Sequence, residues 1–253
     1  MVNTNLKREN TDMEYLFKIF RYDPQRDEKP FFQDFISQPG PMDSILEAMM
    51  EIRNTQAPDL SFRYSCREAV CGSCGMVING NITLACKTTI RALDSQTIVI
   101  EPLPTLELQK DLIVDMDPFF KAMESVRPYL MTQGDPPEKG HRMSEKELDR
   151  IFQFVTCIWC GCCYTACPVI GRDERYFGPA ALAKLYRFVK DPRDNRPRKF
   201  WKDVNTETGM WGCDTVFKCN EVCPKDVRPA DGITGLRREF IKDRLRGFFR
   251  REK

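Results

Sequence analysis

The chain contains 12 cysteines, and eleven of them fall into three groups whose spacing suits metal binding. The opening residues, MVNTNLKRENTD, contain no apolar signal core, so we expect the chain to stay in the reducing compartment where it is made. Disulfides are rare in such a compartment. Metal or redox chemistry is therefore the expected use of these thiols.

The first group follows the pattern C-x4-C-x2-C-x11-C, and its members are Cys66, Cys71, Cys74 and Cys86. Three cysteines on one tight loop with a distant fourth are the ligand spacing of a plant-type [2Fe-2S] cluster. Gly72 and Gly75 let the backbone approach closely, so that its N–H groups can point at the sulfurs. A structural zinc site is the alternative, although zinc ligands normally come as paired C-x2-4-C knuckles.

The second group, CIWCGCCYTACP, follows the pattern C-x2-C-x2-C-x3-C-P of bacterial ferredoxins. The pattern selects Cys157, Cys160, Cys163 and Cys167, followed by Pro168. Cys162 falls outside the pattern, and we expect a buried or packed thiol there rather than a ligand. This run is typical of a protein that holds a [4Fe-4S] cluster.

The third group, CDTVFKCNEVCP, contains Cys213, Cys219 and Cys223 but has Val216 where the same pattern requires a cysteine. In two-cluster ferredoxins, the fourth cysteine of each run ligates the cluster of the other run. This rule predicts a [4Fe-4S] cluster whose ligands are Cys157, Cys160, Cys163 and Cys223. It leaves Cys167, Cys213 and Cys219 for a second cluster.

Val216 decides which cluster this second set holds. An apolar side chain provides no ligand for a fourth iron, so Cys167, Cys213 and Cys219 are predicted to hold a [3Fe-4S] cluster. The alternative is an open [4Fe-4S] cluster whose fourth iron binds water or substrate, as in an iron-sulfur hydratase. Three clusters in a chain without a motif for an organic cofactor favour a series of one-electron carriers.

Several other chemistries are excluded by the residue inventory. With a single histidine, His141, the chain cannot form a Rieske centre or a Cys2His2 zinc site. It lacks the G-x-G-x-x-G and G-x-x-x-x-G-K-[ST] motifs, so nicotinamide, flavin or nucleotide chemistry is not expected here. No Ser, His and Asp set serves nucleophilic catalysis, and we predict no catalytic residue in this chain.

Patterns in the first half of the sequence predict strands around one helix. The strand segments, rich in β-branched and aromatic residues, are 14–22, 76–86 and 97–103. Asn79-Gly80 marks the middle segment as a hairpin. Apolar residues at helical spacing predict a helix over 41–54, and the proline-containing stretch 101–118 is a candidate linker.

Patterns in the second half predict helices. Ser144 and Glu147 form a capping box before an apolar stripe made of Leu148, Ile151, Phe152 and Val155. Another helix is expected to begin at Pro179 and to end before Pro192. The tail 233–251 has the pattern of a basic amphipathic helix, which lies either on a membrane surface or packed against the protein.

The predicted fold class is α+β, with an N-terminal domain over 1–112 and an all-α domain over 113–253. The net charge of +2 is divided unevenly, because the chain is acidic before residue 116 and basic after it. A basic half suits an anionic membrane surface or nucleic acid, or is simply solvated.

The chain resembles the iron-sulfur subunits of the succinate dehydrogenase and fumarate reductase family, the complex II type. The resemblance is carried by SCREAVCGSCGM, CIWCGCCYTACP, FGPAALAKLYRF, DPRD and CDTVFKCNEVCPKDVRP, which occur in family order over nearly the whole chain. Members of the family have an apolar residue at the position of Val216. The resemblance implies a plant-type ferredoxin β-grasp domain followed by a bacterial-ferredoxin-like helical domain.

The resemblance also implies partners. A flavoprotein subunit with FAD would interconvert succinate and fumarate, and electrons would pass singly through the [2Fe-2S], [4Fe-4S] and [3Fe-4S] clusters. Their other terminus would be a quinone at a membrane-anchor cytochrome subunit, often one with haem b. The chain would be held peripherally by that subunit, at the cytoplasmic side of the bacterial inner membrane, and no nucleic acid partner is expected.

Two positions depart from the pattern of the ubiquinone-linked succinate dehydrogenases. Those proteins typically have a His after the first cysteine of the last run and a Trp five residues beyond the cysteine of the first C-P. This chain has Asp214 and Arg172 at those positions. Together with GMWGC at 209–213, the departures favour a menaquinol:fumarate reductase over a succinate dehydrogenase that works in the oxidative direction.

Overall fold

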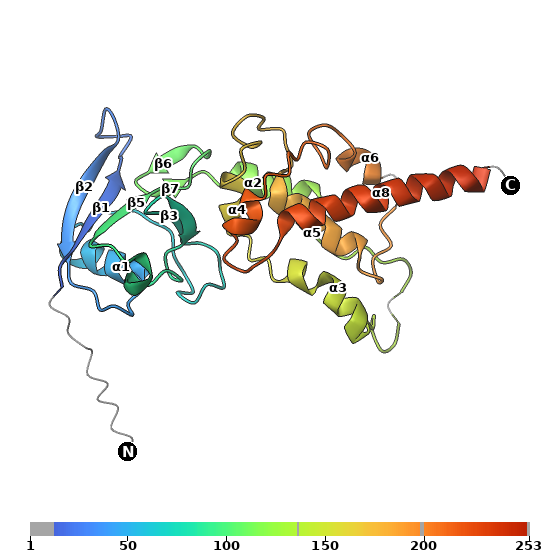
Figure 1. Ribbon diagram of the computed structural model, residues 1–253, viewed down its shortest axis with the longest axis horizontal. Helices are drawn as coiled ribbons and strands as arrows, with labels where there is room; N and C mark the ends of the chain where they lie inside the picture. Colours follow the sequence, from blue (N-terminus) through green and yellow to red (C-terminus); the bar gives the residue numbers. More distant parts are fainter. Residues whose placement is uncertain (1–12, 136, 198–199, 252–253) are drawn as a thin grey trace, which may run out of the picture. The chain divides into compact units, whose positions relative to one another are not determined.

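The computed structural model describes residues 13–135, 137–197 and 200–251. The chain divides into two compact units, residues 1–115 and residues 116–253 (Figure 1). The predicted strands lie in the first unit and most of the predicted helices in the second. The proposed signal-free start of the chain, residues 1–12, lies outside the described residues.

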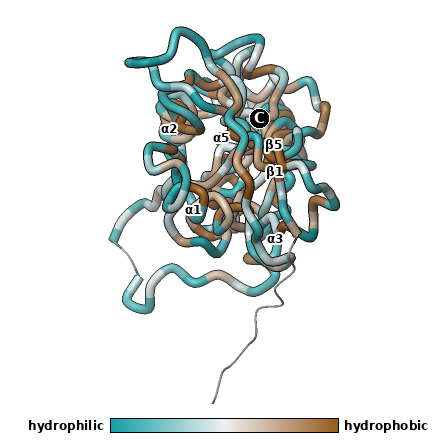
Figure 2. The backbone as a smooth tube through the Cα atoms, turned by 90° about the vertical axis from the view of Figure 1, so that its left-hand side faces the viewer, coloured by the Kyte–Doolittle hydropathy of each residue, from teal (hydrophilic) through white to brown (hydrophobic). Residues whose placement is uncertain are grey.

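The first unit is built on a five-stranded mixed sheet. Its elements are β1 (Tyr15–Arg21), β2 (Phe31–Ser37), α1 (Ile45–Thr55), β3 (Gly75–Ile78), β4 (Asn81–Leu84), a 3-10 turn (Ile90–Leu93), β5 (Thr97–Glu101), β6 (Leu108–Lys110) and β7 (Ile113–Val114). The strand order is β2-β1-β5-β3-β4, in which β1 and β5 are parallel and the other pairs antiparallel. Figure 2 shows hydrophobic residues along β1 and β5, the two central strands that supply much of the core.

Local sequence signals explain the elements that were predicted in this unit. Ser44 caps α1 through a capping box with Glu47, which fixes the start of the helix four residues after the predicted limit. Asn79 and Gly80 both have positive φ angles, of 46° and 77°, as a tight hairpin turn between β3 and β4 requires. The predicted helix and hairpin are confirmed.

The predicted linker is wrong, because residues 101–118 are folded. They contain the hairpin of β6 and β7, and Leu103, Leu112 and Val114 are buried. Asp111 explains why: its carboxylate accepts hydrogen bonds from Arg21 Nε at 3.0 Å and from the Ser61 amide at 2.9 Å. These partners are far away in sequence, so the prolines that suggested a linker gave no sign of them.

The second unit is helical, and its described residues contain no strand. The helices are α2 (Asp117–Ser125), α3 (Glu145–Val155), α4 (Cys162–Thr165), α5 (Gly178–Val189), α6 (Phe200–Val204), α7 (Lys218–Glu221) and α8 (Pro229–Arg251). The capping box at Ser144 and the helix that opens at Pro179 are confirmed. In Figure 1, α8 runs beside α5, against which it packs. Within the described part of the chain, no helix has the length and apolar character needed to cross a membrane.

Helix α3 differs from the prediction in the face that it buries. Ile151 and Phe154 are buried, whereas the other members of the predicted stripe, Leu148, Phe152 and Val155, are exposed. Phe154 packs edge-on against Tyr186 of α5, with ring centroids 5.1 Å apart. The inward face of α3 is therefore narrower than the apolar pattern indicated, and it ends at the loop that carries Cys157.

Candidate metal centres

The loop over residues 66–74, which leads into β3, carries three cysteines of the first predicted group, and the fourth, Cys86, follows β4. Cys74 is buried immediately before β3, while Cys66, Cys71 and Cys86 are partly exposed. The loop has positive φ angles at Arg67, Ala69 and Gly72. Such left-handed residues turn successive N–H groups toward one point, and they are uncommon for side chains other than glycine. The glycine in this turn was predicted, but Arg67 and Ala69 were not.

Backbone N–H groups of this loop point at the cysteine sulfurs. The Val70 and Cys71 amides donate to Cys66 Sγ at 3.3 and 3.2 Å, and the Ala69 amide donates to Cys86 Sγ at 3.2 Å. The Cys66 amide donates to Cys71 Sγ and the Glu68 amide to Cys66 Sγ, each at 3.4 Å. These donors stabilise negative charge on sulfur, so the loop fits a cluster held by thiolates.

The pKa values in this group differ according to burial and hydrogen bonding. Burial raises the pKa of Cys71, but hydrogen bonds from Ser73 and Cys66 outweigh it and lower the pKa to about 6. Burial raises the pKa of Cys74 to about 12. Cys71 is thus the thiol that ionises readily at neutral pH, while Cys74 requires a cation nearby to become a thiolate.

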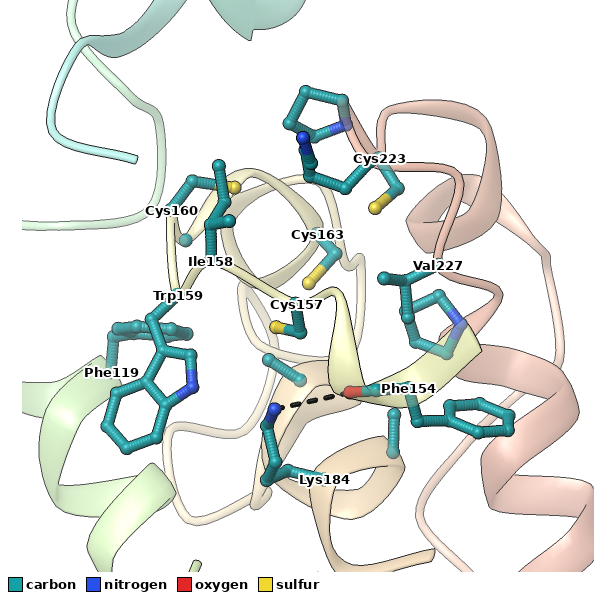
Figure 3. A pocket seen from close by; sticks show the side chains of 16 residues that line it. Phe119, Phe154, Cys157, Ile158, Trp159, Cys160, Cys163, Lys184, Cys223 and Val227 are labelled. Carbon is teal, nitrogen blue, oxygen red and sulfur yellow. Dashed lines mark hydrogen bonds between the residues drawn. The ribbon is translucent and has the colours of Figure 1, made fainter. Parts of the chain in front are cut away.

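In the second unit, one cavity brings together cysteines from both later groups. Cys157, Cys160 and Cys163 line it with Cys223, which lies 60 residues further along the chain than Cys163. Figure 3 shows these four side chains around the cavity, supplied by the segment between α3 and α4, by α4 and by the turn after α7. This is the ligand set predicted from the rule that the fourth cysteine of one run binds the cluster of the other run.

The cavity is apolar, and its thiols are costly to ionise without compensation. Its lining includes Phe119, Ile158 and Val227. Burial raises the pKa of Cys157, Cys163 and Cys223, and neighbouring cysteines raise the pKa of Cys163 and Cys223 further. Four thiolates in such a place need positive charge between them, which an iron-sulfur cluster supplies. The donor set therefore fits such a cluster.

Cys162 is buried, as predicted, with no exposed surface. A hydrogen bond from its side chain, more than any other interaction, lowers the pKa of Cys160. The pKa of Cys162 itself is raised well above the usual value, first by that hydrogen bond and then by burial. Cys162 thus remains a thiol that supports a neighbouring sulfur.

The remaining cysteines, Cys167, Cys213 and Cys219, form a second set in this unit. The pKa of Cys219 is raised to about 12 by burial and further by Cys213 and Cys167, so the three lie within electrostatic reach of one another. Each sulfur faces backbone amides. The Thr215 amide donates to Cys213 Sγ at 3.3 Å, and amide hydrogen bonds partly offset the raised pKa of Cys167 and Cys219.

Helix α8 holds the segment that carries Cys213 in place. The guanidinium group of Arg237 donates to the carbonyl oxygens of Met210 and Cys213 at 2.7 and 2.8 Å. Its cation also lies 5.4 Å from the ring centroid of Trp211. The basic tail predicted from sequence is thus tied to this cysteine set as well as exposed to solvent.

Val216 lies on the surface of an irregular segment and is 50% exposed. Its neighbours Thr215 and Phe217 both have left-handed backbone conformations, with φ angles of 60° and 61°. Among the described residues, no three side chains of His, Cys, Asp or Glu converge closely enough to hold a single metal ion. The cysteines instead surround a cavity or line a loop.

Comparisons with known proteins agree with this arrangement. Residues 16–121 match the 2Fe-2S iron-sulfur cluster binding domain, and residues 153–227 match the 4Fe-4S dicluster domain. The fumarate reductase iron-sulfur subunit of Escherichia coli is 36% identical over 90% of this chain and 93% of its own length. The succinate dehydrogenase iron-sulfur subunit of Coxiella burnetii is 35% identical over 90% of this chain and 97% of its own length. This chain belongs to the family of succinate dehydrogenase and fumarate reductase iron-sulfur subunits.

The fold supports the same membership. The structure of the Mycobacterium smegmatis Sdh1 complex in the apo form contains a chain that matches with a TM-score of 0.80 and 25% identity, over 92% of this chain and 97% of that chain. The resemblance drawn from sequence motifs is confirmed. This iron-sulfur subunit carries a [2Fe-2S] domain followed by a [4Fe-4S] dicluster domain, as part of an oxidoreductase.

Sequence reasoning did not identify Lys184 of α5, which lines the cavity beside the cysteines. Its side chain is buried, and Nζ donates to the carbonyl oxygen of Phe154 at 3.2 Å (Figure 3). That carbonyl belongs to the last turn of α3, where a cation also interacts favourably with the helix dipole. Burial lowers the pKa of Lys184, whereas the nearby Cys157 raises it. In the sequence analysis it appears only as one residue of the motif FGPAALAKLYRF.

We expect Lys184→Gln to lower the midpoint potential of the cluster held in this cavity, because a buried positive charge stabilises the more negative reduced form. One unit charge at this range in a protein interior is worth on the order of 100 mV. The measurement is a redox titration of the reduced [4Fe-4S] signal by electron paramagnetic resonance (EPR). Lys184→Arg, which keeps the charge, is the control and should shift the potential little. An unchanged potential in Lys184→Gln would contradict this role.

Proposed function

We propose that this chain relays single electrons between an FAD-containing succinate/fumarate flavoprotein and a quinone site in the membrane. The observation that carries the proposal is the cavity that Cys157, Cys160 and Cys163 share with Cys223, since it joins two separate cysteine runs in the manner of two-cluster ferredoxins. When bound, the clusters supply one-electron redox chemistry. The chain's own residues hold them, direct amide dipoles at their sulfurs and exclude water from the cavity.

The proposal assigns a ligand set to each cluster. Cys66, Cys71, Cys74 and Cys86 hold [2Fe-2S], and Cys157, Cys160, Cys163 and Cys223 hold [4Fe-4S]. The third set, Cys167, Cys213 and Cys219, holds [3Fe-4S]. The amide-to-sulfur hydrogen bonds in the first and third sets, and the shared cavity of the second, support these assignments.

We assign the first unit to the plant-type ferredoxin β-grasp fold and the second to a bacterial-ferredoxin-like helical fold. The mixed sheet with α1 packed against it supports the first assignment. Two cysteine runs, each of which contains a short helix and is followed by a proline, support the second. The order of the two units along the chain matches the order of the two domain families.

The proposed partners are a flavoprotein subunit with FAD and a membrane-anchor cytochrome subunit with quinone and haem b. The chain lies, in this proposal, on the cytoplasmic side of a bacterial inner membrane, held peripherally. Subunit status in the Escherichia coli and Coxiella burnetii relatives supports a multi-subunit assembly. Exposed apolar side chains at Trp211, Val216 and Phe217, next to the third cysteine set, suit a surface that is covered by the anchor.

We propose the menaquinol:fumarate reductase direction, with succinate dehydrogenase as the alternative. The two positions that depart from the ubiquinone-linked pattern are paired with each other: Arg172 Nη2 lies 2.8 Å from Asp214 Oδ2. Arg172 and Asp214 therefore form an ion pair beside Cys167 and Cys213. The two departures from the ubiquinone-linked pattern are thus coupled, because each residue is the partner of the other. Assays of both directions, with menaquinone and ubiquinone analogues, test this choice.

The cluster inventory is tested on anaerobically purified protein. We expect a brown protein with about nine irons per chain and no zinc, because the three clusters contain two, four and three irons. Its oxidised form should give the near-isotropic EPR signal of [3Fe-4S], replaced on reduction by a [2Fe-2S] signal. A colourless zinc protein would identify a zinc-stabilised interaction protein instead. Hydratase activity that disappears when the cluster loses its fourth iron would identify a dehydratase with an open [4Fe-4S] cluster.

A further inference from the structure

Tyr176 lies two residues before α5 and is 2% exposed. Its hydroxyl oxygen is buried, and no group of the described residues meets it in good hydrogen-bonding geometry. Buried hydroxyl groups in proteins are nearly always hydrogen-bonded, because an unpaired one loses its interactions with water without replacement. The Tyr176 hydroxyl therefore calls for an acceptor that the polypeptide alone does not place in good geometry.

The surroundings of this hydroxyl identify the kind of partner. Burial raises the pKa of Tyr176 far above its usual range. The further causes are the charges of Cys213 and Cys167, a hydrogen bond with the Cys213 side chain, and the charge of Cys219. These are the three residues of the proposed [3Fe-4S] ligand set. The hydroxyl thus faces a group of sulfur atoms.

The backbone and the packing of the ring hold the hydroxyl in this position. The Tyr176 amide donates to the Asp173 carbonyl oxygen at 3.1 Å, and the following amide, of Phe177, donates to the Thr208 carbonyl oxygen at 3.0 Å. The ring lies close to Gly212, where an added Cβ would come within 3.0 Å of it. Because Gly212 immediately precedes Cys213, the phenol is fixed against the segment that carries one proposed ligand.

We propose that the Tyr176 hydroxyl donates a hydrogen bond to a sulfur atom of the [3Fe-4S] centre. The acceptor is either a sulfide of the cluster or the Cys213 thiolate that binds it, and the hydrogen bond raises the reduction potential of the cluster. The inference rests on the proposed [3Fe-4S] cluster. A hydrogen bond to sulfur withdraws electron density and stabilises the reduced form, which carries one more negative charge. Tyr176 is in this sense a positioning and tuning residue for electron transfer, with no bond made or broken at the phenol.

The test is Tyr176→Phe in the full-length chain, followed by EPR. We expect an oxidised [3Fe-4S] signal of unchanged intensity, a midpoint potential shifted downward, and the loss of one exchangeable-proton coupling in electron-nuclear double resonance after exchange into D2O. Tyr186→Phe is the matched control, because the pKa of Tyr186 is influenced by Glu239, Lys242 and Arg238 and by no cysteine. It should leave the [3Fe-4S] potential unchanged.

A second modification keeps the test decisive if Tyr176→Phe prevents cluster assembly. 3-Fluorotyrosine placed at position 176 is a more acidic donor of nearly the same size, so it should shift the potential upward. A wild-type [3Fe-4S] signal with no shift in either variant, or an unchanged proton coupling, would overturn the inference and leave the proposed function intact. Absence of a [3Fe-4S] signal from the wild-type protein would overturn both.

Discussion

Val216→Cys is expected to convert the [3Fe-4S] cluster into a [4Fe-4S] cluster. The substitution supplies a fourth thiolate at the position that the ferredoxin pattern reserves for one. The near-isotropic EPR signal of the oxidised protein should disappear, and the iron content should rise from about nine to about ten per chain. Because Val216 is half exposed in an irregular segment, the change requires little repacking and the fold should be retained.

The functional effect of this change is expected to be large. A [4Fe-4S] cluster in place of [3Fe-4S] lowers the midpoint potential at this site, on the order of 100 mV or more within the wide range that iron-sulfur centres span. Electron transfer to or from quinone should slow accordingly, while reduction of the other two clusters continues. Val216→Ala is the control and should keep the [3Fe-4S] signal. Persistence of that signal in Val216→Cys would show that position 216 does not face the cluster.

Replacing the last cysteine of either run with alanine should remove the cluster that is bound mainly by the other run. The two variants are Cys223→Ala and Cys167→Ala. Cys223→Ala removes a ligand from the cavity shared with Cys157, Cys160 and Cys163, so the reduced [4Fe-4S] signal should be lost and the oxidised [3Fe-4S] signal kept. Cys167→Ala should do the reverse. The loss in Cys223→Ala should be complete, since a missing thiolate in an apolar cavity has no substitute ligand.

The controls for this pair separate ligand loss from general unfolding. Cys162→Ala removes a buried thiol outside the ligand sets and should leave all three clusters in place. The [2Fe-2S] signal should persist in every variant, because Cys66 and its partners lie in the other unit. If Cys223→Ala abolished the [3Fe-4S] signal and Cys167→Ala the [4Fe-4S] signal, the crossed assignment would be wrong.

Sequence patterns predicted the elements whose cause is local. The capping boxes at Ser44 and Ser144 and the turn at Asn79-Gly80 act within four residues, so the helices and the hairpin could be predicted. The folding of residues 101–118 could not, because it depends on the buried pair of Arg21 and Asp111, 90 residues apart. The exposure of Leu148, Phe152 and Val155 in α3 could not be predicted either, because an apolar stripe does not determine which of its side chains another element covers.

The proposed sites divide in the same way. Cysteine spacing alone predicted every proposed ligand, because cluster geometry imposes spacing on the chain. The groups that surround the sulfurs could not be predicted. Lys184 lies in the motif FGPAALAKLYRF, but nothing in that motif assigns it to a cluster, and Tyr176 belongs to no motif. Both reach the cysteines only through the packing of α5 and the turn before it. The left-handed residues Arg67 and Ala69 likewise belong to loop geometry and not to residue type.

The amides that point at Cys66, Cys71 and Cys86 are fixed by the backbone of the loop and not by mobile side chains. Dipoles that are already oriented do not have to turn when the charge on the sulfurs changes by one unit. The reorganisation energy of a cluster held by this loop should therefore be small. A small difference in potential should then suffice for electron transfer at a cluster held by this loop, and the sign of that difference sets the direction.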